Sequence, residues 1–206
     1  MEDKKFIKSF ISQRDMGEDR ESCLIIALQN ARVLFRRDKE GNAFDIDICE
    51  KLDGIIEFEP FIGLVNYFLV LDIIGAIFTD KKDGVGIRIK EVLKIYGNMS
   101  EDEQKVISTL RNCLVHNYSL ADKEKKIKFI LDNSCEEMIK HPIKVWDGDY
   151  SIKNDDSTST SINPKKLIDK IEEIYEKVKK EVICGKLNHK LENIEELKTR
   201  FTVKYE

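Results

Sequence analysis

The feature that most constrains the fold is a run of apolar residues from Pro60 to Phe78, PFIGLVNYFLVLDIIGAIF. About 20 apolar residues can cross a bilayer as a helix, so the run is either a membrane span or a helix at the centre of a protein. Asn66 and Asp72 lie well inside it, and an aspartate at the bilayer centre costs about 2.5–3.5 kcal/mol. We therefore predict a buried central helix. Pro60 is suited to opening it, because a missing N–H costs nothing at the first helical position.

The charges of the chain nearly cancel, since 35 Lys and Arg against 39 Asp and Glu leave a formal net charge of −4. Sequence-independent binding of nucleic acid depends on many phosphate contacts, so this balance argues against a protein that coats nucleic acid. It is compatible with an RNA enzyme that has a small basic cleft, because net charge does not say where Lys and Arg gather in space.

Cysteine usage and the N-terminal sequence both favour a cytoplasmic protein. The cysteines number five and form no C-x-x-C pair, which favours free thiols and gives no sign of a zinc site. The opening MEDKKFIKSF lacks the long apolar core of a signal peptide. We expect a cytoplasmic protein that uses neither a metal ion nor a cofactor.

The first part of the chain has the apolar periodicity of helices. It predicts a helix around residues 6–11 and another at about 18–38, the latter stopped by Gly41-Asn42. The stretch at 44–56, FDIDICEKLDGII, fits either a strand or a short helix, and we favour the helix.

Two further helices are expected after the apolar run. Apolar spacing predicts a short one over 87–95, ended by Gly97-Asn98. Ser100 and Glu103 then form a capping-box pattern, S-x-x-E, which starts the next helix.

After residue 120 the pattern changes from helices to short strands. KKIKFIL (125–131), PIKVW (142–146) and YSI (150–152) are expected to be strands, the last two forming a hairpin around the turn at 147–149. The polar stretch KNDDSTSTS (153–161) is predicted to be a flexible connection or a weak edge strand.

A long helix is expected near the C-terminus. Asn163-Pro164 makes a strong start, as cap and first position, and Gly185 makes a stop. A shorter helix should follow at about 191–197.

We therefore predict a mainly α fold: a helical bundle with a small antiparallel β-element and a long C-terminal helix. The chain, 1–206, is interpreted as a single domain in three parts. Residues 1–122 form the helical core, 123–162 the β-element with a flexible loop, and 163–206 the C-terminal helices.

The stretch at 111–118, RNCLVHNY, concentrates the groups that phosphodiester chemistry needs. Arg111 has a planar, permanently charged fork that can hold a phosphate. His116 can donate or accept a proton near neutral pH. Asn112 lies one helical turn before His116 and could orient its ring, and Tyr118 lies two turns after Arg111. These four residues are the candidate catalytic group.

Spacing alone does not settle this assignment. On a regular helix Arg111 and His116 point apart by well over a right angle, so the motif should straddle a kink or helix end, or line a wide cleft. An exposed or salt-bridged arginine beside a structural histidine is the competing interpretation.

RNCLVHNY resembles the R-x4-6-H motif of the HEPN superfamily, with a polar residue directly after the arginine, and the tighter R-x4-H-x-Y form of the HepT toxins. The apolar helix, the short helix and the capped helix that carries the motif resemble the helical HEPN core. The resemblance covers roughly residues 20–120.

The resemblance implies a metal-independent ribonuclease, often a toxin or antiphage effector, that acts as a homodimer. Arg111 and His116 would be the catalytic pair and Asn112 the polar position. Tyr118 would be the tyrosine that a nucleotidyltransferase antitoxin modifies in HepT systems. A dimer suits the chemistry, because one histidine cannot easily serve both the attacking and the leaving oxygen.

Other residues leave alternatives open. Asp72 either supports the Arg or His of the motif or belongs to an internal hydrogen-bond network, since a buried carboxylate needs a partner. Cys113 is expected to be a small core residue rather than a nucleophile. Four lysines could guide RNA, although a solvated face is favoured: Lys123, Lys125, Lys126 and Lys128. The alternative function is a non-catalytic HEPN-like module that binds nucleotide, RNA or protein.

Overall fold

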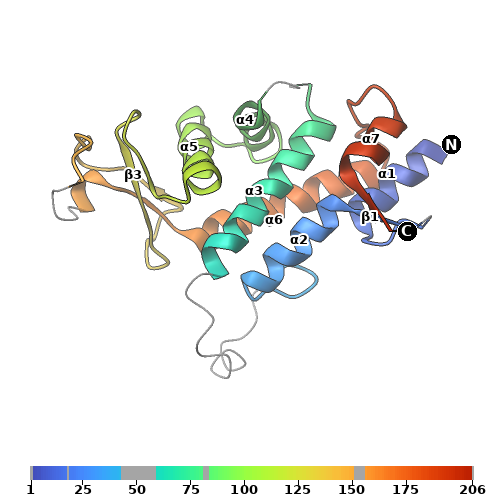
Figure 1. Cartoon of the computed structure of the whole chain (residues 1–206), viewed down its shortest axis with the longest axis horizontal. Coiled ribbons are helices and arrows are strands. Elements are labelled where there is room, and N and C mark those ends of the chain that lie inside the picture. Colours follow the sequence, from blue (N-terminus) through green and yellow to red (C-terminus); the bar gives the residue numbers. More distant parts are fainter. Residues whose placement is uncertain (1, 18, 43–58, 81–83, 151–155, 206) are drawn as a thin grey trace.

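The computed structural model describes residues 2–17, 19–42, 59–80, 84–150 and 156–205 (Figure 1). These residues form a mainly helical protein with two small sheets, so the predicted fold class is confirmed. The helices are α1 (Glu2–Ser12), α2 (Cys23–Leu34), α3 (Glu59–Phe78), α4 (Val85–Ile95), α5 (Glu101–Asn117), α6 (Pro164–Ile183) and α7 (Ile194–Phe201), with one 3-10 turn, η3 (Asp156–Thr158).

The apolar run forms α3, which packs against α2, α4, α5 and α6. Its inward side is sealed from solvent, with Leu64, Tyr67, Leu71, Ile74 and Ile77 each 0% exposed. By length and composition Phe61–Phe78 is apolar enough to cross a membrane, and 61% of that stretch is buried inside the protein. The prediction of a buried central helix is confirmed.

The predicted capping signals are present at two helix starts. The Ser100 hydroxyl accepts from the Glu103 N–H at 3.3 Å, and the Glu103 carboxylate accepts from the Ser100 N–H at 2.8 Å, which completes the capping box of α5. Asn163 caps α6 through a 3.0 Å bond from the Lys166 N–H, and Pro164 is the first helical residue.

The predicted helix at 18–38 is shorter than expected. Strand β1 (Arg20–Ser22) precedes it and pairs antiparallel with β6 (Thr202–Lys204), and Ser22 then caps α2. The helix ends at Leu34, before Gly41-Asn42, because Arg36 adopts a left-handed φ of 52°. The ambiguous stretch at 44–56 lies outside the described residues.

The β-element lies at the end of the molecule opposite both termini (Figure 1). Its four strands are β2 (Ala121–Asp122), β3 (Ile127–Leu131), β4 (Ile139–Lys140) and β5 (Thr160–Ile162), in the order β2-β3-β5-β4. The pairs β2–β3 and β4–β5 are antiparallel, whereas β3–β5 is parallel. The strand expected at 125–131 is confirmed over Ile127–Leu131, whereas residues 125–126 belong to the turn before it.

The predicted hairpin at 142–152 is wrong in its first strand, since residues 142–146 form no strand and 151–152 lie outside the described residues. Here the chain folds back on itself, because the Trp146 indole N–H donates to the Asp149 carbonyl at 3.1 Å and its ring packs edge-on against Tyr150. The prediction for the polar stretch at 153–161 is also wrong at its C-terminal end. Its last two residues begin β5, a strand paired on both sides.

Near the C-terminus the long helix ends as predicted. Ile183 is the last residue of α6, and Gly185 follows with a left-handed φ of 72°. The short helix expected at 191–197 begins later, at Ile194, because Asn193 caps it by accepting from the Glu196 N–H at 2.9 Å.

Candidate functional site

The motif at 111–118 occupies the last two turns of α5 and its C-terminal cap. Buried Ile107, Leu110 and Leu114 hold this helix to the core. The opposite side of the helix is open: Arg111 and Asn112 are half-buried, whereas His116 is exposed. The motif therefore lies on a firmly anchored element with its polar groups at the surface.

Arg111 and His116 meet within a single chain. Arg111 Nη1 lies 2.9 Å from His116 Nε2. The expectation that the two side chains diverge on a helix is therefore wrong, because the long arginine side chain bends back over the surface to the exposed ring. The helix does end directly after the motif, at Asn117.

The contact between Arg111 and His116 bears on the protonation state of the imidazole ring. A guanidinium has five N–H donors and no acceptor, so His116 Nε2 must supply the lone pair. A hydrogen bond across this contact therefore requires the tautomer with a lone pair on Nε2 and the proton on Nδ1. A neutral imidazole with an accessible Nε2 is the form that can act as a general base.

Asn112 contacts the arginine rather than the histidine. Its Oδ1 accepts from Arg111 Nη1 at 3.1 Å, so both hydrogens of Nη1 are used, by Asn112 and by His116. The role predicted for Asn112, orienting the ring of His116, is therefore corrected to positioning Arg111. Among the described residues Arg111 Nε and Nη2 have no acceptor, and these two groups form the edge that a phosphate can bind bidentately.

Tyr118 ends α5 in an unusual backbone conformation. Its φ of 46° and ψ of 42° are left-handed, a region in which glycine is the ordinary residue and a bulky side chain is rare. Its ring stacks on Phe61 at a centroid distance of 6.3 Å, yet the residue remains 80% exposed. The strained turn thus places an accessible phenol beside the start of α3.

Asp72 has a partner on the neighbouring helix. Its carboxylate accepts from Arg88 Nε of α4 at 2.8 Å, and the two side chains are 19% and 14% exposed. Burial and the nearby Arg88 charge lower the pKa of Arg111, whereas the Asp72 charge raises it. An arginine stays protonated under these influences, so Arg111 offers a partly desolvated positive charge. Of the two roles considered for Asp72, the internal network is the one that these contacts favour.

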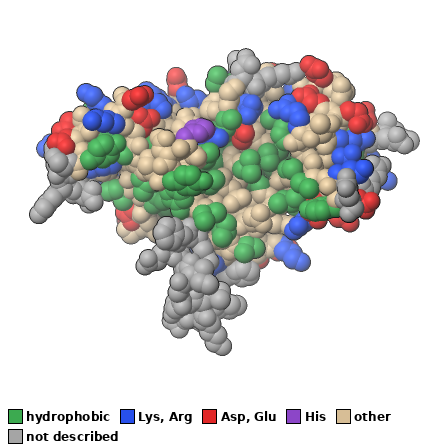
Figure 2. Space-filling view, in the orientation of Figure 1, with side chains coloured by type: hydrophobic (Ala, Val, Ile, Leu, Met, Phe, Trp, Pro, Cys, Tyr) green, Lys and Arg blue, Asp and Glu red, His purple; other side chains and the backbone are tan. Residues whose placement is uncertain are grey.

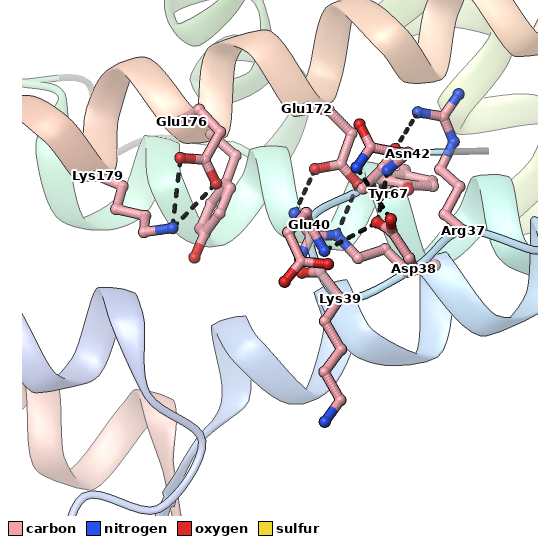
Figure 3. A network of polar contacts seen from close by, with 12 residues as sticks. Arg37, Asp38, Lys39, Glu40, Asn42, Tyr67, Glu172, Glu176 and Lys179 are labelled. Carbon is pink, nitrogen blue, oxygen red and sulfur yellow. Dashed lines mark hydrogen bonds and ion pairs between the residues drawn. The ribbon is translucent and has the colours of Figure 1, made fainter. Parts of the chain in front are cut away.

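A second arginine cluster, which the sequence did not reveal, joins α2, α3 and α6 (Figure 3). Arg32 Nε and Nη2 donate to the two oxygens of Glu172 at 2.9 and 2.7 Å, and the Tyr67 hydroxyl donates to Glu172 at 2.7 Å. Burial and the Glu172 charge raise the pKa of Tyr67 far above its usual range.

Gly41 belongs to the same cluster, because a Cβ at this position would lie 2.8 Å from the Glu172 carboxylate. Arg37 donates to the Gly41 carbonyl and to Asp169. A cavity of about 420 Å³ opens beside these residues and is lined by several carboxylates. Within the described residues no group of His, Cys, Asp and Glu is arranged to hold a metal ion.

Cys113 is confirmed as a core residue. It is 1% exposed, and burial raises the pKa of its thiol, which disfavours the nucleophilic thiolate. It cannot present sulfur to a substrate at the surface.

No model of a known protein family matches the chain, and no curated protein or solved structure matches it either. The resemblance to the HEPN superfamily therefore stays a prediction, carried by RNCLVHNY and the helices that precede it.

Proposed function

We propose that this protein is a metal-independent, cytoplasmic endoribonuclease. The observation that carries the proposal is the 2.9 Å contact between Arg111 Nη1 and His116 Nε2 on an exposed surface. It puts a phosphate-binding cation and a proton acceptor within one phosphate's width of each other. These are the two functions that cleavage of RNA through its own 2′-hydroxyl needs.

The contact between Arg111 and His116 is the resting state. A phosphate of the substrate can replace His116 as the acceptor for Arg111. An anionic phosphate oxygen is a stronger acceptor for a guanidinium than a neutral imidazole is. When Arg111 turns its fork to the phosphate, His116 Nε2 loses its donor and can accept the 2′-hydroxyl proton. The 2′-oxygen then attacks phosphorus, the bond to the 5′-oxygen breaks, and a 2′,3′-cyclic phosphate and a 5′-hydroxyl result.

The leaving 5′-oxygen needs a proton from the opposite side of the phosphorus. One His116 cannot supply it in the same in-line step, since its ring lies on the side of the attacking oxygen. A second copy related by a twofold axis beside the motif would add a second Arg111 and a second His116 to the same groove, and this second ring, released from its own Arg111 and protonated, would donate the proton to the 5′-oxygen. We therefore propose that the homodimer is the active form.

An apolar stripe beside the motif supports the dimer. Ile62 and Leu69 on α3 are 49% and 46% exposed, and Val65 between them is half-buried. These positions share one face of α3, and Phe61 at its start stacks on Tyr118. Figure 2 shows hydrophobic side chains gathered on the face along which α3 runs in Figure 1. A second copy would cover this stripe.

The toxin interpretation rests on Tyr118. A phenol that is 80% exposed, two residues after His116, is accessible to a modifying enzyme. Adding a nucleotide there would place negative charge beside Arg111 and obstruct the groove. We propose a role as a toxin or antiphage effector, with a nucleotidyltransferase as the antitoxin.

The direct test is cleavage of a labelled RNA with and without EDTA. Wild type is expected to leave 2′,3′-cyclic phosphate ends, and chelation should not slow it. His116→Ala should lose about 10²–10⁴ in rate. The matched control is His189→Ala, in the loop before α7, which should cut normally. If chelation abolishes cleavage and metal restores it, the mechanism is wrong.

The alternative function has its own outcome in the same assay. If neither wild type nor His116→Ala cuts RNA, and both are equally tolerated when expressed, the protein is a non-catalytic module that binds nucleotide, RNA or a protein partner.

The dimer has a separate test in the double variant Ile62→Glu/Leu69→Glu. Charges on the apolar stripe should yield monomers by sedimentation and abolish cleavage while the fold persists. Ile183→Glu, at an apolar residue 43% exposed at the end of α6, is the control and should remain dimeric. A monomeric wild type with full activity would contradict the dimer.

A further inference from the structure

A second cavity lies between α5 and the β-element and has the size of a ligand pocket, about 400 Å³. Val106 of α5, Ile127 of β3 and the neighbouring Val145 give it apolar walls. Val145 is 77% exposed, so one wall is an open apolar surface on which a flat ring can lie.

Cations surround the opening of this cavity. Three lysines line it, Lys105 on α5 and Lys125 and Lys126 in the β2–β3 turn, whereas Asp102 is the one acidic residue among its described walls. Lys125 also pairs with Asp122 at 3.0 Å, which holds its side chain at the turn. Apolar walls with a cationic rim suit a ligand that is flat at one end and anionic at the other.

Two threonine hydroxyls inside the cavity are without a hydrogen-bond partner among the described residues. Thr109 and Thr160 line the cavity and are only 7% and 2% exposed. In the part of the chain that the structure describes, neither hydroxyl makes a hydrogen bond, and neither oxygen is among the buried side-chain atoms that lack a partner, so both hydroxyls are open to the cavity. Each can donate to a phosphate or sugar oxygen of a ligand in the cavity.

The cavity continues the surface that carries His116. Residues seven apart on a helix differ by only about 20° in direction, so Thr109 and His116 lie on the same face of α5. Lys105 and Asn112 share this face as well. At about 1.5 Å per residue, Thr109 lies about 10 Å from His116 along the axis. That is the length of about three stacked nucleotides.

We propose that this cavity binds one nucleotide of the RNA strand on one side of the cleaved phosphate. A base would lie on Val145 and the apolar floor, and the lysines and threonines would hold its phosphate and sugar. The inference rests on the proposed ribonuclease function, because it assigns the cavity to the substrate of the Arg111–His116 pair. It gives the lysines of the β2–β3 turn beside α5 a role in holding the strand.

The test measures binding of a fluorescent 12-nucleotide RNA in the His116→Ala background, so that cleavage does not interfere. Adding Lys125→Gln/Lys126→Gln should weaken binding about 10-fold at physiological salt. It should also lower the slope of log affinity against log salt by about 0.7 for each phosphate that the lysines no longer neutralise. The charge-matched control is Lys5→Gln/Lys8→Gln on α1, at the opposite end of the molecule from β3 (Figure 1).

A second variant, Thr160→Val, removes one hydroxyl at nearly constant volume and should weaken binding severalfold, with folding checked by circular dichroism.

The failure of this inference and the failure of the proposed function give different results. If His116→Ala binds RNA and the cavity variants bind it equally well, the strand lies elsewhere and only this inference fails. If wild type cuts no RNA and His116→Ala binds none, the proposed ribonuclease function itself is wrong. Binding of free uridine monophosphate to the cavity, without any effect of its variants on RNA affinity, would also overturn the proposal.

Discussion

Arg32 and Arg111 are both withdrawn from bulk water, but their surroundings differ. Arg32 is held by both oxygens of Glu172, and the two side chains are 9% and 10% exposed. Arg111 meets two neutral acceptors, Asn112 and His116, at an open surface. Its positive charge has no carboxylate in hydrogen-bond contact among the described residues, and part of its fork remains available.

This difference separates a structural arginine from one that is ready for a ligand. A buried guanidinium paired bidentately has its donors used and its charge balanced, so removing its partner mainly costs stability. An arginine with neutral acceptors retains most of its attraction for an anion. The Arg32 cluster should therefore respond to mutation through folding, and the Arg111 cluster through activity.

The largest expected effect is on folding, in Glu172→Ala. It strands the buried Arg32 charge and removes the acceptor of the Tyr67 hydroxyl, so the free energy of unfolding should fall by about 3–5 kcal/mol. Denaturant titration measures this change. Glu173→Ala, whose 63% exposed side chain pairs only with Lys170 among its described contacts, should cost less than about 1 kcal/mol. Equal effects of the two variants would remove the distinction between the clusters.

The next effect is on activity, in Arg111→Lys. Lysine keeps the charge but loses the planar fork, so cleavage should fall by about 10²-fold, similar to removing one donor from a transition-state oxyanion site. Stability should stay within about 0.5 kcal/mol of wild type, as for most surface substitutions. Arg14→Lys, at a surface ion pair with Glu21, is the control and should change neither property. Unfolding of Arg111→Lys would mean that this arginine is structural too.

Asp72→Asn tests a residue whose expected effect lies between those of the Arg32 cluster and the Arg111 cluster. The carboxylate serves Arg88 directly and Arg111 only through its charge. We expect a loss of about 1–3 kcal/mol in unfolding free energy, because the ion pair of half-buried Arg88 with Asp72 becomes a hydrogen bond to a neutral amide. Cleavage per folded molecule should change little. A large loss of cleavage with unchanged stability would instead assign Asp72 to support of the motif.

Local signals in the sequence were sufficient to predict much of the fold. The apolar run, the Ser100–Glu103 capping box and the Asn163-Pro164 helix start depend on neighbouring residues, and all three are confirmed. The β-element was harder to predict. Its inner strand, Thr160–Ile162, pairs in parallel with β3 about 30 residues earlier, and short polar strands have weak patterns of their own.

The members of the candidate site stay a prediction, and its geometry differs from the one that the sequence suggested. The residue types at 111–118 indicated phosphodiester chemistry, whereas helical angles suggested that Arg111 and His116 diverge. Backbone angles do not describe the reach of a long side chain at a helix end. The buried cluster around Glu172 was missed because Arg32 and Glu172 are 140 residues apart. A charged residue within each of two apolar helical stripes was the available signal.

The smallest expected effect concerns Asn112, whose amide oxygen holds Arg111 rather than the ring of His116. Asn112→Ala removes one hydrogen bond of about 0.5–1.5 kcal/mol, so cleavage should slow by about two- to tenfold. Asn117→Ala, at the exposed last residue of α5, is the matched control.

The pH profile decides which neighbour Asn112 serves. If it positions Arg111, the rate falls at every pH and the titration of the catalytic histidine does not move, because arginine remains charged throughout. A shifted profile would mean that Asn112 acts on His116. In that case the two hydrogen bonds of Arg111 Nη1 would follow from the position of the His116 ring. How Arg111 turns to a phosphate would then need another explanation.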